Sequence, residues 1–217
     1  MTLWQRVITG DGRRRTRFHD YEQRACGLGA LVGLPRAAAT AALLKAFGWR
    51  PELPWLGFSA VTCIEQLLQP HWCLLEFGSG MSTVWFARRV GQIVSIETDP
   101  EWHSRVTALL RNRGLSERVE SRLVPASLEG LASTLPRGVD FALVDGTSRD
   151  VATALALSVV KPGGYIYLDN SDVRALEYTE ARKQLLSVAS AARFFTDFCD
   201  GQVGVTQGLL VQTRTLE

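Results

Sequence analysis

The residues best suited to chemistry lie in one short segment, residues 75–83, with the sequence LEFGSGMST. An apolar run precedes its glycines and an amphipathic run follows them, so we expect a strand, a tight turn and a helix here. Gly78 and Gly80 allow the backbone to turn sharply and to approach a ligand closely. Free N–H groups at the start of the next helix can bind a carboxylate or a phosphate. A Gly-x-Gly pair alone is explained equally well as a structural turn. The neighbouring residues must therefore distinguish a ligand-binding loop from a plain turn.

A carboxylate ends the next apolar run, because Glu97 closes residues 94–97 (VSIE). In a doubly wound sheet, a carboxylate there can reach both hydroxyls of a ribose bound over the first loop. The alternative is a helix N-terminal carboxylate, with Asp99 beside it. Dinucleotide-binding folds have a third glycine where this chain has Thr83. Glu76 would repel a pyrophosphate but not the ammonium group of S-adenosylmethionine, so the segment favours this sulfonium cofactor.

Short apolar runs alternate with longer amphipathic runs through most of the chain. We expect helices at residues 59–68, 82–90, 101–113, 149–160 and 175–189, and strands at residues 72–77, 92–97, 118–124, 139–144, 164–168, 194–198 and 205–212. This alternation predicts an α/β fold with a doubly wound, Rossmann-like, mostly parallel sheet covered on both faces. The connection around Gly201 and Gly204 is too short for a parallel crossover, so the last two strands should be antiparallel.

The N-terminal quarter of the chain differs from the rest. We expect residues 1–54 to form a helical extension and residues 55–217 to form the main domain, because the prolines of residues 49–54 (WRPELP) punctuate the chain. Residues 25–47 are fairly apolar, but a proline and two charged residues interrupt them. They are interpreted as one or two packed helices rather than a transmembrane segment. A weakly membrane-associated arm is the alternative.

Charge and cysteine content exclude some functions. The net charge of +2 argues against a protein whose main function is to bind nucleic acid. The basic run at residues 13–17 (RRRTR) is interpreted as a solvated arm, with a phosphate- or lipid-facing patch as the alternative. The four cysteines form no CxxC pair and have no zinc-site spacing. Reduced thiols in a cytoplasmic protein are the simplest account.

Residues 55–170 resemble the class I S-adenosylmethionine-dependent methyltransferases. Four segments, in the right order and at plausible spacing, are similar to motifs of that family: residues 76–80, 96–97, 141–146 (FALVDG) and 161–170 (KPGGYIYLDN). The family fold is a seven-stranded sheet with an antiparallel last strand. This agrees with the antiparallel pair expected at the C-terminus.

The resemblance implies roles for individual residues around the cofactor. It places Trp102 on the adenosine, although a half-buried helix residue is an equal alternative, and Asp145 near the methyl group. The remaining implied contacts are Gly78, Ser79 and Gly80 along the cofactor, Ser82 and Thr83 at its methionine end beside Glu76, Glu97 at the ribose, and Ala126 and Ser127 at the adenine.

The ends of the fourth and fifth strands carry Asp145, Asp169 and Asn170, an oxygen-rich set that suits Mg²⁺. This resembles the metal site of the catechol-type O-methyltransferases. That subgroup places a catalytic lysine shortly after the first aspartate, but Ser148 stands in the corresponding run here. The alternative is a cofactor-facing Asp145 and a capping pair of Asp169 and Asn170. Asp145 or Asp169 is the candidate for proton removal.

The predicted function is O-methylation of a small molecule, with the N-terminal extension capping the active site. Trp49, Trp55 and Phe58 are candidates for the pocket lining and equally for the core. An N-methyltransferase or RNA-directed enzyme is the first alternative, although no Asn/Asp-Pro-Pro-Tyr/Phe motif follows the fourth strand. A non-catalytic protein that keeps only the cofactor site is the second. The sequence predicts neither the substrate nor the oligomeric state.

Overall fold

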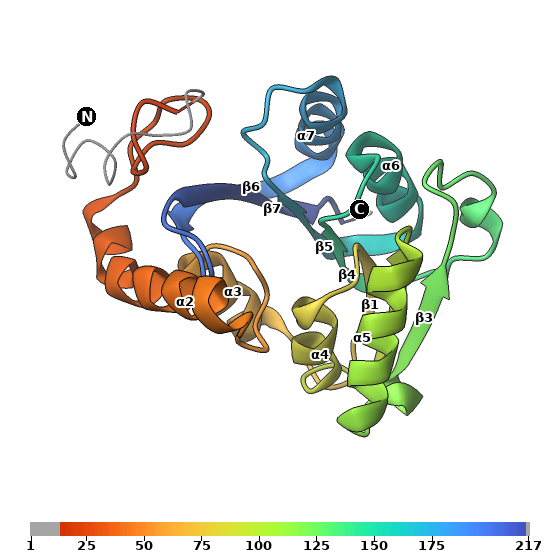
Figure 1. Cartoon of the computed structure of the whole chain (residues 1–217). Helices are drawn as coiled ribbons and strands as arrows, with labels where there is room; N and C mark the ends of the chain where they lie inside the picture. Colours follow the sequence, from red (N-terminus) through yellow and green to blue (C-terminus); the bar gives the residue numbers. More distant parts are fainter. Residues whose placement is uncertain (1–13, 216–217) are drawn as a thin grey trace.

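The computed structural model describes residues 14–215, which form a seven-stranded sheet with helices on both faces (Figure 1). The strands are β1 (Cys73–Phe77), β2 (Gln92–Glu97), β3 (Val119–Leu123), β4 (Val139–Val144), β5 (Val160–Asp169), β6 (Ala189–Phe198) and β7 (Val205–Thr213). They lie in the order β3-β2-β1-β4-β5-β7-β6. Strands β1 to β5 pair in parallel, while β7 is antiparallel to both β5 and β6. The doubly wound fold and the antiparallel last strand predicted from the sequence are confirmed.

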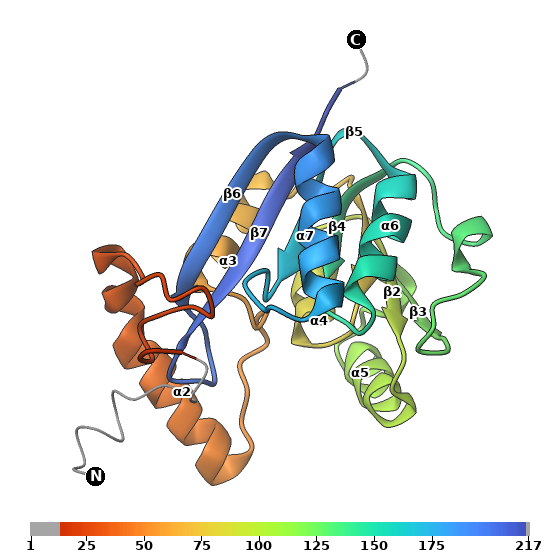
Figure 2. The same cartoon turned by 90° about the horizontal axis from the view of Figure 1, so that it is seen from above.

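Two sets of helices cover the sheet, as Figure 2 shows from a second direction. One face packs against α3 (Phe58–Leu67), α4 (Met81–Ala87) and α5 (Pro100–Asn112), and the other against α6 (Arg149–Val159) and α7 (Leu176–Val188). The fully buried strand β4 shows why two cores form. Its Phe141 and Leu143 belong to the first core, and Ala142 and Val144 to the second, because successive strand residues point to opposite faces.

Strands β5 and β6 begin earlier than the sequence predicted. β5 starts at Val160 rather than residue 164, and β6 starts at Ala189 rather than residue 194. β6 is the edge strand, and its first half is mostly short, exposed residues. Such residues show no alternation of apolar and polar positions, so the sequence carries no signal for where this strand begins.

The N-terminal extension is helical as predicted, and a small apolar cluster joins its Ala37 to Phe198 and Val205. It contains a 3₁₀ helix, η1 (Leu28–Gly33), and α2 (Leu34–Phe47). In α2 only Ala37 and Thr40 are buried, and the side chain of Phe47 at its end is 79% exposed. By length and apolar composition alone, the helical stretch Leu28–Phe47 would suffice to cross a membrane.

Polar contacts join the extension to the turn between β6 and β7. Arg36 of α2 donates two hydrogen bonds to the buried carboxylate of Asp200, at 3.0 and 2.6 Å. In the basic run, Arg14 donates to the carbonyl of Val205 and Arg17 to that of Val203. These two arginines are therefore tied to the hairpin rather than solvated, while Arg13 lies outside the described residues.

Candidate active site

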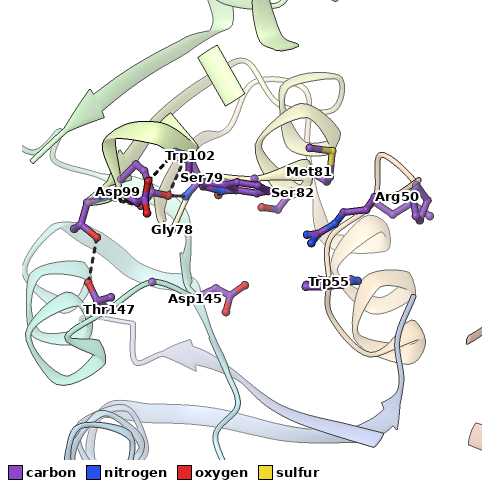
Figure 3. Close-up of a pocket in the computed structure, with 16 residues that line it drawn as sticks. Arg50, Trp55, Gly78, Ser79, Met81, Ser82, Asp99, Trp102, Asp145 and Thr147 are labelled. Carbon is purple, nitrogen blue, oxygen red and sulfur yellow. Dashed lines mark hydrogen bonds between the residues drawn. The ribbon is translucent and has the colours of Figure 1, made fainter. Parts of the chain in front are cut away.

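A cavity of about 470 Å³ opens at the carboxyl ends of β1, β2 and β4 (Figure 3). Ligands gather at this edge in doubly wound folds, because the loops there diverge on either side of the sheet. The lining residues come from the β1–α4 loop, the start of α5, the β4–α6 turn and the segment before α3: Gly78, Ser79, Gly80, Met81, Ser82, Glu97, Thr98, Asp99, Trp102, Asp145, Gly146, Thr147, Arg50, Pro51, Leu53 and Trp55.

The two glycines of the β1–α4 loop have different functions. Gly78 has a left-handed backbone (φ +94°), and a Cβ added there would lie 2.8 Å from the amide nitrogen of Gly146. The ends of β1 and β4 therefore approach as closely as backbone allows, and the amide of Asp145 donates to the carbonyl of Phe77 at 2.9 Å. A Cβ on Gly80 would meet only the Ser82 hydroxyl, at 3.7 Å. Gly78 is needed for the fold of the loop, whereas Gly80 leaves open space above it.

Glu76 and Thr83 lie behind this loop, not on the cavity wall. The fully buried Glu76 carboxylate accepts hydrogen bonds from the hydroxyls of Ser82 (2.5 Å), Thr83 (2.6 Å) and Ser95 (2.7 Å). The Thr83 hydroxyl also accepts from the amide of Gly80 at 2.8 Å. Burial raises the pKa of Glu76 to about 7, although the three hydroxyls oppose the shift. The two residues hold the loop in place, and Glu76 does not present a charge to the cavity.

Glu97 lines the cavity and fixes the loop from the other side. One of its oxygens accepts from the amide and the hydroxyl of Ser79, both at 3.0 Å. The other accepts from the amides of Thr98 (2.7 Å) and Asp99 (2.9 Å). The N-cap of α5 is Asp99, which accepts from the amide of Trp102 at 2.8 Å. Of the four donors to Glu97, only the Ser79 hydroxyl can rotate away and leave an acceptor position for a ligand.

Trp102 and the segment before α3 close the cavity. The indole nitrogen of Trp102 donates to the carbonyl of Ser79 at 2.6 Å, so its ring lies beside the loop. Arg50 stacks its guanidinium 4.4 Å above the ring of Trp55 and 5.8 Å above that of Trp102. Trp55 lines the cavity, as the sequence allowed, whereas Trp49 and Phe58 do not. Sequence reasoning missed Arg50, because its position depends on where the segment before α3 folds back.

Ala126 and Ser127 are not on the cavity wall. The carbonyl of Ala126 accepts a hydrogen bond from the Ser148 hydroxyl at 3.0 Å. The next residue, Leu128, instead lines a narrow extension of the cavity beside Gly146 and Thr147. The adenine border expected at Ala126 and Ser127 stays a prediction, with Leu128 as a further candidate.

The turns after three successive strands are strained. Leu128, Ser148 and Asn170 follow β3, β4 and β5, and each has a positive φ of 51–55°. Non-glycine residues rarely adopt this conformation, and such strain gathers at functional sites. Of the three, Leu128 lines the narrow extension of the cavity.

Arg149 joins the two aspartates at the ends of β4 and β5. Its guanidinium is almost fully buried and donates to the Asp145 carboxylate at 3.0 Å and to the Asp169 carbonyl at 2.5 Å. It also stacks 4.7 Å above the ring of Tyr178. Asp145 keeps 29% of its side chain exposed, and Figure 3 shows it across the open space from the loop of Ser79 and Ser82. Sequence reasoning missed this role of Arg149, although a basic residue four positions after an aspartate was the available signal.

The pKa values of both carboxyl groups are raised above their ordinary range. Burial raises the pKa of Asp145, although the positive charge of Arg149 opposes the shift. Burial and the negative charge of Asp145 raise the pKa of Asp169 well above its ordinary range. A single guanidinium cannot neutralise both carboxylates, and the pKa of the more deeply buried Asp169 is raised further than that of Asp145.

The magnesium site predicted from Asp145, Asp169 and Asn170 does not fit this arrangement. Arg149 already supplies the positive charge beside Asp145, where an ion would have to sit. The Asn170 amide faces away from the aspartates and donates to the hydroxyl of Thr206 at 3.1 Å. Within residues 14–215, no cluster of three or more His, Cys, Asp or Glu side chains could hold a metal.

The strand order, with β7 alone reversed, is that of the class I S-adenosylmethionine-dependent methyltransferases, and the cavity contains the loop and the carboxylate that resemble their motifs. Residues 75–171 match the model of a family described as a methyltransferase domain. This part of the chain is therefore similar to a methyltransferase domain, and the chain as a whole has the fold of such enzymes.

Solved structures show the same fold at low sequence identity. An O-methyltransferase from Bacillus cereus, in complex with SAH, matches with a TM-score of 0.62 and 18% identity, over 83% of this chain and 99% of that chain. TomG from Streptomyces achromogenes, an O-methyltransferase involved in tomaymycin synthesis and in complex with SAM, matches with a TM-score of 0.61 and 20% identity, over 82% and 89% of the two chains. No curated protein sequence matches this chain significantly.

Proposed function

We propose that the chain methylates a hydroxyl group of a small molecule, with S-adenosylmethionine in the cavity between Trp102 and Asp145. The observation that carries this proposal is the position of Asp145, whose carboxylate faces the β1–α4 loop across the cavity (Figure 3). A base there can take a proton from an acceptor hydroxyl next to the cofactor. The O-methyltransferases among the similar structures support the choice of oxygen as the nucleophile.

The cavity wall fits the cofactor. Glu97 would hold the ribose hydroxyls once the Ser79 hydroxyl turns away, and the open space above Gly80 would admit the ligand close to the backbone. Trp102 would lie along the adenosine, and Ser82 would contact the methionine end. Glu76 and Thr83 would act indirectly, by holding the loop.

Bound S-adenosylmethionine supplies an electrophilic methyl group, and the chain's own residues prepare the acceptor. Asp145 accepts the acceptor's proton while the acceptor oxygen gains the methyl group and the sulfur–methyl bond breaks. Arg149 holds Asp145 in place and partly neutralises it. The charge of Asp145 and burial raise the pKa of the neighbouring Asp169, so a proton is held more tightly there than on a solvated aspartate. Alignment of the nucleophile with the methyl group supplies the rest of the rate enhancement.

Residues 1–54 are proposed to serve as a cap, and residues 55–217 as the methyltransferase domain. Arg50, Pro51 and Leu53 support this division, because they line one side of the cavity. The cytoplasm is the proposed location, in keeping with the four free cysteines.

The test is methyl transfer from labelled S-adenosylmethionine to a panel of phenols and alcohols, with the corresponding amines as controls. Asp145→Asn should lower kcat by roughly 10²–10⁴-fold, the usual contribution of a general base, while SAH affinity stays within a few-fold of wild type. EDTA should leave activity unchanged, because Arg149 occupies the place of a metal ion. Equal turnover by Asp145→Asn, or preferential methylation of the amines, would contradict the proposal. Activity lost with EDTA and restored by Mg²⁺ would revive the metal site.

A further inference from the structure

A second cavity, of about 690 Å³, lies beyond Asn170 at the end of β5. It shares no lining residue with the first cavity. Its wall combines Asn170, Arg174 and Tyr178 from the β5–α7 region with Arg14 and Tyr21 from the N-terminal arm. Figure 2 shows how this arm comes back beside the hairpin of β6 and β7.

Arg149 contacts one lining residue of each cavity. The guanidinium of Arg149 contacts Asp145, which lines the first cavity, and stacks on Tyr178, which lines the second. A ligand in the second cavity would therefore lie near Asp145, at the end of the first cavity where the proposed methyl transfer takes place. Methyl transfer needs the acceptor oxygen directly in line with the methyl group and within reach of the carboxylate that takes its proton.

The second cavity is positively charged. Of its described lining residues, Arg14 and Arg174 carry charge and none is acidic. Arg174 is exposed and has no ion pair or hydrogen bond with any of residues 14–215. Arg14 is held in place by the carbonyl of Val205 and stacks 4.0 Å above the ring of Tyr21. The wall thus offers two guanidinium groups, which suit carboxylate and phosphate groups.

Two neighbouring acids have partners inside the protein, and the charge of Arg14 opposes the rise in the pKa of one of them, Asp172. Asp172 is buried, and its carboxylate accepts from the amide of Tyr21 at 2.6 Å. Asp20 is fully buried and binds the side chains of Arg24 and Gln207. Both carboxylates are engaged inside the protein rather than in the cavity.

We propose that this second cavity binds the methyl acceptor, and that the acceptor is an anion with a carboxylate or phosphate group on a flat ring. The inference rests on the proposed function and names its substrate class. Arg174 and Arg14 bind the anionic group, the rings of Tyr21 and Tyr178 contact the flat body, and the hydroxyl to be methylated points toward Asp145.

The test is calorimetric titration of the SAH-saturated protein with three probes: 4-hydroxybenzoate, phenyl phosphate and the neutral 4-hydroxybenzyl alcohol. At least one anion should bind 10-fold or more tightly than the alcohol. The anion that binds more tightly shows whether the cavity prefers a carboxylate or a phosphate group. Arg174→Gln should weaken anion binding by 5-fold or more without changing that of the alcohol. Arg105→Gln is the matched control, because Arg105 is exposed on α5 away from the cavity and should leave all three affinities unchanged.

Equal affinities for anions and alcohol, no anion binding, or an unchanged affinity in Arg174→Gln would overturn the inference. These outcomes do not contradict the proposed function, provided that SAH binds when the protein is saturated with it before the probes are added. Failure of SAH to bind would overturn the proposed function and this inference with it.

Discussion

The two walls of the first cavity are built on different principles. On the side of β1 and β2, neutral donors satisfy both carboxylates: three hydroxyls bind Glu76 behind the loop, and three amides and one hydroxyl bind Glu97 at the wall. On the side of β4 and β5, the guanidinium of Arg149 donates to the carboxylate of Asp145 and to the backbone carbonyl of Asp169. There, among residues 14–215, Arg149 Nε and Asp169 Oδ1 have no hydrogen-bond partner.

The difference matches two tasks. A wall whose polar groups are all satisfied stays in one conformation and preorganises a binding site. A wall with two interacting carboxyl groups and unsatisfied polar atoms can transfer a proton at low cost. A small change in the surroundings alters the relative pKa values of the two carboxyl groups. We therefore expect substitutions on the first wall to change cofactor affinity and those on the second to change turnover.

The largest effect on the first wall should come from Gly78→Ala. Its Cβ would meet the backbone of Gly146 at 2.8 Å, and the left-handed backbone adds about 1–2 kcal/mol of strain. The loop must shift, so SAH affinity should fall by about 100-fold, where each tenfold is about 1.4 kcal/mol. Calorimetric titration with SAH measures this.

Gly80→Ala is the matched control for this substitution. Its backbone is extended, and its Cβ would enter open space, so the thermal stability of the ligand-free protein should stay near wild type. SAH affinity should fall only if the ligand approaches the backbone there. Wild-type affinity in Gly78→Ala would show that the loop is not the rigid wall described.

Much of the first wall could be predicted from the sequence, because its residues lie next to the strands that position them. The glycine loop and Glu97 each follow a buried strand directly, so the order of strands and the edge where they end fix their positions. The orientation of Glu76 could not be predicted, because a pattern of residue types does not show which side of the loop a side chain occupies. Arg50 and Arg14 were beyond prediction, since long-range packing of the N-terminal segments brings them to their cavities.

A smaller effect, on stability rather than binding, tests the burial of Glu76. Its pKa of about 7 in the folded chain lies above the ordinary value of 4.5, so the folded state binds this proton more tightly. The stabilisation is complete below about pH 4.5 and is lost as the pH rises through about 7, with an upper limit of about 3 kcal/mol. Glu76→Gln removes the titrating group, so the difference in unfolding free energy between the two proteins should change over this window.

Urea unfolding at pH 4.5, 6 and 8 measures that difference. Glu101→Gln is the control, because Glu101 is an exposed residue of α5 and its loss should leave the pH dependence as in wild type. Parallel curves for wild type and Glu76→Gln would mean that Glu76 is ionised and solvated, contrary to its position behind the loop.

The central claim is that the cavity of Gly78, Glu97 and Trp102 binds S-adenosylmethionine. Titration calorimetry of the wild-type protein with S-adenosylmethionine, SAH and NAD tests it most directly. The two sulfur compounds should bind at one site per chain and raise the melting temperature, whereas NAD should give no heat, because the loop lacks the third glycine of dinucleotide sites. Binding of NAD, or no binding of either sulfur compound, would contradict the account.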